Sequence, residues 1–147
     1  MVPILITMDL EVAYDHSIND QRKILDRLNA DLKKIGLPIT IFTTSEAATE
    51  FKEEILRLKS AGHNICCHGY NHGISENYRT MDQFTINEFI KNSTNNIENI
   101  IQDKVDSFRG PGFSTSSETQ NALIRYGYRS DYSVCSQRFD FMNSIGG

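Results

Sequence analysis

The residues best suited to chemistry fall into four short groups, far apart in the chain, each directly after an apolar stretch: Asp9 and Glu11, His68 and His72, Arg109, and Asp131. Carboxylate and imidazole together are typical ligands of a divalent ion such as Zn²⁺, Co²⁺, Fe²⁺ or Mn²⁺. An arginine that ends an apolar stretch is costly to bury unless it pairs with a carboxylate. The four groups therefore indicate a site for one divalent ion, provided that the fold brings them together.

The spacing within the first two groups favours a shared site. Asp9 and Glu11 are two apart, so on a strand both point to one side while Leu10 packs on the other. Two close carboxylates repel unless a cation or a proton lies between them. His68 and His72 are four apart and share one face of a helical turn. Taken alone, each pair is also typical of a solvated strand end or of chance.

Three of the four histidines lie within ten residues, from His63 to His72, and this clustering favours a function for His68 and His72. His63 precedes the neighbouring strand and is predicted to be structural. Cys66 and Cys67 are adjacent within an apolar stretch, so their side chains point to opposite faces of a strand. We interpret them as small core residues rather than metal ligands.

The elements that must position these groups alternate along the chain. Five apolar stretches predict strands: Ile4–Ile6, Pro38–Phe42, Ile65–Cys67, Val105–Phe108 and Tyr128–Asp131. Four amphipathic stretches predict the helices between them: 24–35 ending at Gly36, 51–58 ending at Gly62, one from the capping box Thr85–Glu88 to Ile101, and one from the capping box Thr115–Glu118 to Gly127. This order predicts βαβ units and a parallel sheet, whose strands share one carboxyl edge.

Length and composition limit the architecture and the partners. The 147 residues predict a single α/β domain spanning residues 1–147. A closed (β/α) barrel needs about 250 residues, so we expect an incomplete or distorted barrel that lacks its final strands. The net charge of −4, without a Lys/Arg cluster, argues against nucleic acid, and no apolar run is long enough for membrane insertion. The exposed edge strand of an open barrel would allow a homo-oligomer.

Three cysteines, two of them adjacent, argue against a disulfide framework and favour reduced thiols. The first residues enter a strand-like stretch without a recognisable signal peptide. Both observations predict a cytoplasmic location.

The motifs together resemble a known family. Thr7–Glu11, Gly62–His72, Phe108–Gly112 and Gly127–Asp131 resemble, in order and spacing, the polysaccharide deacetylase family, also called NodB-like domains or carbohydrate esterase family 4. The likeness extends from Ile4 to about Ser133 and includes the second predicted strand. It implies a distorted (β/α) barrel and a metal-dependent hydrolase. Such an enzyme removes N-acetyl groups from an amino-sugar glycan or a bacterial cell-envelope saccharide.

The resemblance also implies roles for individual residues. One divalent ion, Zn²⁺ above all, would be held by Glu11, His68 and His72. Asp9 would be the general base and Arg109 would keep it ionised and oriented. Asp131 would belong to the catalytic set by pairing with the proton donor, and Pro111 and Gly112 would contact the N-acetylated saccharide: these three complete the implied site.

Two departures from the family pattern leave alternatives open. Family members commonly carry adjacent aspartates in the first motif, whereas Leu10 separates Asp9 from Glu11 here, so the two acids could exchange roles. Some relatives with this pattern act on cyclic imides or ureides. The family's final Leu-x-His motif supplies the general acid, yet no histidine follows His72. An imide or ureide hydrolase and a catalytically degenerate glycan-binding domain are therefore the alternative interpretations.

Overall fold

The computed structural model describes residues 4–134. Within this range, five strands form a parallel sheet. The strands, in chain order, are β1 (Thr7–Leu10), β2 (Thr40–Thr43), β3 (Asn64–Cys67), β4 (Ser107–Phe108) and β5 (Ser130–Asp131). Each strand pairs in parallel with the next one along the chain. A sequential order with helical crossovers is that of a barrel wall, and the described strands do not close it. The prediction of an incomplete (β/α) barrel is confirmed.

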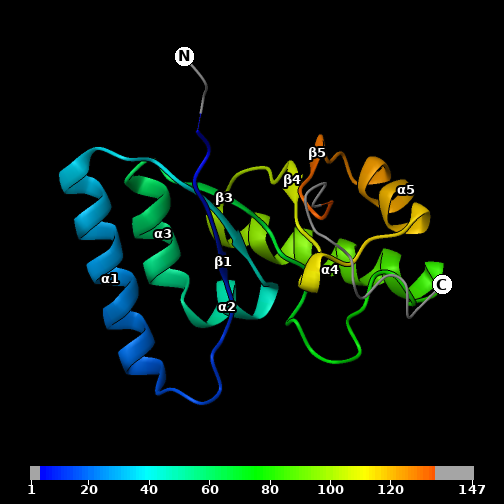
Figure 1. The fold of residues 1–147 in the computed structure, drawn as a ribbon, viewed down its shortest axis with the longest axis horizontal. Helices are drawn as coiled ribbons and strands as arrows, with labels where there is room; N and C mark the ends of the chain where they lie inside the picture. Colours follow the sequence, from blue (N-terminus) through cyan, green and yellow to red (C-terminus); the bar gives the residue numbers. More distant parts are fainter. Residues whose placement is uncertain (1–3, 135–147) are drawn as a thin grey trace.

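The helices that connect the strands are α1 (Ile18–Ile35), α2 (Ser45–Glu50), α3 (Lys52–Ser60), α4 (Gln83–Ile101) and α5 (Ser117–Arg125). Helix α1 packs on α3, and α4 packs on α2, α3 and α5 (Figure 1). One helix was predicted between β2 and β3, but the structure has two, α2 and α3. They are separated at the buried Phe51, whose backbone leaves helical geometry at φ −106° and ψ 33°. None of the described helices combines the length and apolar character needed to cross a bilayer.

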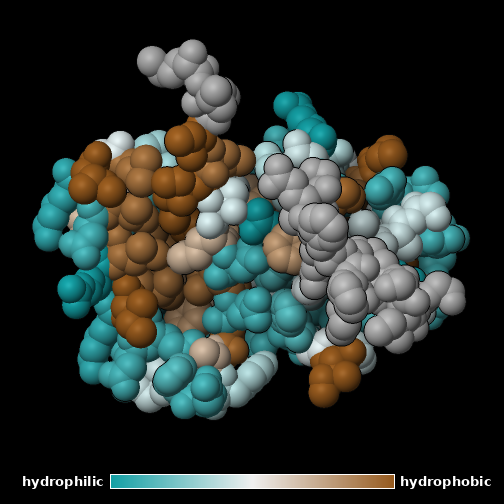
Figure 2. Space-filling model, viewed as in Figure 1, coloured by the Kyte–Doolittle hydropathy of each residue, from teal (hydrophilic) through white to brown (hydrophobic). Residues whose placement is uncertain are grey.

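The first strand lies later in the chain than predicted. Ile4–Ile6 precede it and are 86%, 59% and 43% exposed, whereas Thr7–Leu10 pair with Thr40–Thr43 of β2. Apolar composition misled here, because a strand is defined by its hydrogen-bonded neighbour. Asp9 is therefore inside β1 and Glu11 is the first residue after it. Figure 2 shows apolar surface over α1 and the chain that leads into β1. Pairing of two chains at this edge stays a prediction.

Both predicted capping boxes are shifted. Asp82 is the N-cap of α4, where its side chain accepts from the Thr85 amide at 2.9 Å, so Thr85 lies inside the helix rather than at its start. Asp82 thus accepts from the Thr85 amide, which the predicted capping box assigned to the Glu88 side chain. Helix α5 is capped by Ser116 instead of Thr115. The end of α1 is as predicted, with Gly36 in the left-handed region at φ 63°.

The core lies between the sheet and its helices. Its fully buried members come from strands and helices alike and include Ile41, Phe108, Ile55, Leu58, Ile86, Ile90 and Ile97. Cys66 and Cys67 are also buried, and burial raises the pKa of Cys66 to about 12 and that of Cys67 to about 11. Their burial confirms the prediction that both are core residues, and the raised pKa values lead us to expect unreactive thiols. His63 is structural as well, because its buried Nδ1 accepts from the Ile39 amide at 3.2 Å.

Candidate functional site

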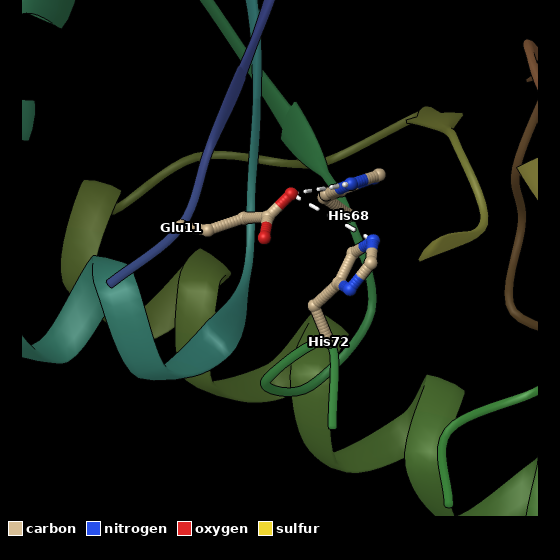
Figure 3. A group of neighbouring side chains, drawn as sticks. All are labelled: Glu11, His68 and His72. Atoms are coloured by element: carbon tan, nitrogen blue, oxygen red, sulfur yellow. Dashed lines mark ion pairs between the residues drawn. The ribbon is translucent and has the colours of Figure 1, made fainter. Parts of the chain in front are cut away.

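One carboxylate and two imidazoles converge beside the carboxyl ends of β1 and β3 (Figure 3). Glu11 Oε1 is 3.5 Å from His68 Nε2 and 3.8 Å from His72 Nε2, and all three ligand atoms lie within 4.8 Å of one another. Ligands about 2.1 Å from a tetrahedral Zn²⁺ would be separated by about 3.4 Å. The donor set and its spacing thus fit a divalent ion after small side-chain adjustments.

The ring of His68 is held with one nitrogen ready for a ligand. The Arg109 carbonyl lies 2.7 Å from Nδ1 and can only accept, so Nδ1 carries the proton. The lone pair of Nε2 then faces Glu11. The side chain of His68 is only 2% exposed, and this burial lowers its pKa, an effect that the nearby Asp9 carboxylate opposes. A neutral, oriented imidazole is the form that binds metals.

His72 sits on a sharply turned loop between β3 and α4. Its φ of 58° lies in the left-handed region, which is uncommon for a residue with a side chain. Nε2 accepts a hydrogen bond from the Gly112 amide at 3.1 Å. A metal ion bound to this nitrogen would replace the hydrogen bond from Gly112. Metal binding would therefore release one contact that holds the 110–113 loop.

Asp9 and Arg109 form an ion pair next to the three candidate ligands. Arg109 Nη1 donates to Asp9 Oδ1 at 2.6 Å, and Nη2 donates to Thr7 Oγ1 at 3.0 Å. The guanidinium lies over the Phe42 ring, 4.2 Å from its centroid. Asp9 Oδ2 is 3.8 Å from His68 Nε2. One carboxylate oxygen is thus bound by Arg109 while the other lies toward the candidate metal site.

Asp131 lies apart from this group. Its Oδ1 accepts from the amide and hydroxyl of Ser133, and its Oδ2 accepts from Thr115 Oγ1 at 3.3 Å. Ser133 Oγ in turn accepts from the Gly110 amide at 2.8 Å. Across the described range, no hydrogen bond or ion pair joins Asp131 to a candidate metal ligand. Asp131 supports the loop that follows Arg109, and its predicted catalytic role stays a prediction.

The two residues predicted to contact substrate lie in the short 3-10 turn Pro111–Phe113. Pro111 is buried, whereas Gly112 is exposed and its amide meets His72. Sequence reasoning missed Glu76, whose buried carboxylate accepts from the His72 amide at 2.8 Å. An acid four residues after a histidine has no distinctive pattern, so only the fold identifies it.

Comparison with protein families agrees with this geometry. The family model described as polysaccharide deacetylase matches residues 8–130. The chain belongs to the polysaccharide deacetylase family. The matched range includes Asp9, Glu11, both candidate histidine ligands and Arg109.

Individual relatives and solved structures are similar to this chain at low sequence identity. A peptidoglycan deacetylase of Helicobacter pylori is 26% identical over 115 residues, which cover 78% of this chain and 38% of the relative. The structure of BA3943, a family 4 pseudoenzyme from Bacillus anthracis, superposes with a TM-score of 0.71 at 20% identity, covering 86% of this chain and 42% of that one. The structure of the Puue allantoinase superposes with a TM-score of 0.65 at 21% identity, covering 78% of this chain and 37% of that one. The chain thus spans less than half the length of each.

Proposed function

We propose that this chain is a metal-dependent amide hydrolase that removes N-acetyl groups from an amino-sugar glycan or a cell-envelope saccharide. The observation that carries the proposal is the convergence of Glu11, His68 and His72 beside the Asp9–Arg109 ion pair. Membership of the polysaccharide deacetylase family supports the same chemistry. Zn²⁺ is the ion that we expect, because one carboxylate and two imidazoles are ligands that it prefers.

The residues of the chain divide the work of hydrolysis. A divalent ion held by the three ligands would supply Lewis acidity to an amide carbonyl and to a water molecule. Asp9 would accept the proton of the attacking water through Oδ2, since Arg109 occupies Oδ1 and keeps the carboxylate oriented. Water adds to the carbonyl carbon, the carbon–nitrogen bond breaks, and acetate and a free amine result. The exposed Gly112 amide beside His72 would contact the substrate.

Cleavage of the carbon–nitrogen bond also requires a group that protonates the leaving amine, and the residues named above do not include one. No histidine follows His72 in the sequence, and Asp131 is occupied by Ser133 and Thr115. A general acid contributes about 10²–10⁴-fold to such a reaction, so the chain by itself could bind metal and glycan yet turn over slowly. The likeness to a pseudoenzyme favours this degenerate glycan-binding domain as the second candidate. The likeness to an allantoinase keeps a ureide substrate as the third.

Metal affinity, measured by calorimetry with Zn²⁺ and Co²⁺, tests the site first. Glu11→Gln and His68→Ala are expected to lower the affinity by more than about 100-fold, since even outer-shell partners account for about 10–100-fold. Asp9→Asn should keep the metal. His16→Ala is the control, because the His16 side chain is 69% exposed and pairs only with Asp15 among the described residues. Loss of metal in Asp9→Asn with retention in Glu11→Gln would mean that the two acids exchange roles.

Substrate assays then separate the three candidates. Release of acetate from N-acetylated chitooligosaccharides, lost in Asp9→Asn, supports the deacetylase. Hydrolysis of allantoin or a cyclic imide without acetate release supports the ureide alternative. Binding of metal and oligosaccharide without turnover supports the degenerate domain. A wild-type chain that binds neither Zn²⁺ nor Co²⁺ would contradict the proposal.

A further inference from the structure

Glu76 is a buried carboxylate that the proposed chemistry does not use. It lies between β3 and α4, is 3% exposed, and accepts four hydrogen bonds. Oε1 accepts from the Tyr70 amide at 2.5 Å and from the Tyr78 hydroxyl at 2.9 Å. Oε2 accepts from the amides of Asn71 and His72, both at 2.8 Å. Three consecutive backbone amides thus point at one side chain.

Such a run of amides forms a concave nest for an anion, and here the protein supplies the anion itself. The nest exists because the loop turns sharply at both ends, with Gly69 at φ 79° and His72 at φ 58°. A non-glycine residue keeps such a conformation only where its surroundings hold it there. The Glu76 carboxylate is the group that bonds to the amide of His72 itself.

The opposite side of the same loop is held by α2. The amides of Ser45 and Glu46, in the first turn of this helix, donate to the carbonyls of Gly69 at 3.0 Å and Tyr70 at 2.9 Å. The space beside Gly69 is also taken, because a Cβ there would collide with Glu76 Oε1 and lie 3.0 Å from Pro111. The loop therefore has one packed conformation, and its amide side depends on Glu76.

We propose that Glu76 is a positioning residue that sets the backbone of His72, and thereby its imidazole, in the place needed to bind a metal ion with Glu11 and His68. This inference rests on the proposed metal site. Without the carboxylate, three inward-facing amides would lack their acceptor, and the loop would rearrange to recover hydrogen bonds elsewhere. The third ligand would then leave the site while Glu11 and His68 stay.

The test is Co²⁺ affinity and the visible absorption spectrum of the Co²⁺-loaded full chain, for the wild type and Glu76→Gln. The variant keeps the shape but turns one oxygen into an amide that faces backbone donors. We expect an affinity loss of about 10–100-fold, as for other outer-shell partners, and a changed spectrum. Glu54→Gln is the matched control, since Glu54 on α3 is 4% exposed and is ion-paired to Arg22 of α1 and Arg57 of α3. It should leave affinity and spectrum unchanged.

The His72→Ala background separates positioning from general loosening. If Glu76 acts through His72, then Glu76→Gln lowers affinity in the wild type but adds nothing in His72→Ala. An equal loss in both backgrounds, or wild-type affinity and spectrum in folded Glu76→Gln, would overturn the inference. If Glu76→Gln does not fold by circular dichroism, Glu76→Asp replaces it, because it keeps the charge and withdraws the carboxylate by one methylene. Failure of the wild type to bind Co²⁺ would instead overturn the proposed metal site, a distinct result.

Discussion

Replacing Arg109 by methionine should destabilise the fold through one identifiable ion pair. The pair with Asp9 has an N–O distance of 2.6 Å, and the side chains are 11% and 29% exposed. Breaking a fully buried pair costs about 3–5 kcal/mol, whereas an exposed pair contributes about 0.2–1 kcal/mol. The Arg109–Asp9 pair lies between these limits, so we expect a coupling of about 1–3 kcal/mol.

The total effect of Arg109→Met is larger than this coupling, because the guanidinium also lies over Phe42 at 4.2 Å. A desolvated cation–π contact contributes about 1–2 kcal/mol. The free energy of unfolding should therefore fall by about 2–5 kcal/mol. Asp9→Asn in the Arg109→Met background should cost less than Asp9→Asn alone, because the unpaired carboxylate is then gone.

A double-mutant cycle in urea measures this coupling. The sequence has no tryptophan, so circular dichroism is the suitable signal. Arg57 and Asp26 form the control cycle, with a distance of 2.9 Å but side chains 47% and 54% exposed, and should couple by only about 0.2–1 kcal/mol. A coupling below about 0.5 kcal/mol for Arg109 and Asp9 would refute the reasoning, because independent sites show the same value. Arg109 could then not be credited with orienting Asp9.

Two further predictions concern the core and a helix start. In a Cys135→Ser background, Cys66 and Cys67 of the folded chain should not react with a thiol reagent at pH 8, since raised pKa values of about 12 and about 11 leave them protonated. Both should react once the chain is unfolded in guanidinium. Labelling of the folded chain would contradict their burial. Asp82→Ala should lower the free energy of unfolding by about 1 kcal/mol through loss of the α4 cap, whereas Glu88→Ala should change it by less than about 0.5 kcal/mol. The reverse order in urea unfolding would favour the capping box predicted from sequence.

Sequence reasoning succeeded where a local rule decides the outcome. Residues two apart on a strand share a face, and Asp9 and Glu11 do lie on the side of His68 while Leu10 is buried. Parallel strands joined by helices share a carboxyl edge, and residues about 60 and 100 positions apart meet there. The predicted bounds of the first strand, Ile4–Ile6, and the predicted starts of two helices at capping boxes were wrong. Composition does not say which strand neighbour or hydrogen-bond acceptor is nearest.

By itself, the sequence determined the order of the elements, the parallel class of the sheet and the set of side chains that gather at its edge. Tertiary structure alone decided how those side chains are held. The Arg109 carbonyl sets the tautomer of His68, Glu76 holds the amide of His72, and Asp131 turns to Ser133 instead of the site. Each of these is a hydrogen bond at or beyond the carboxyl end of a strand, and its partner depends on distances that no spacing in the sequence encodes.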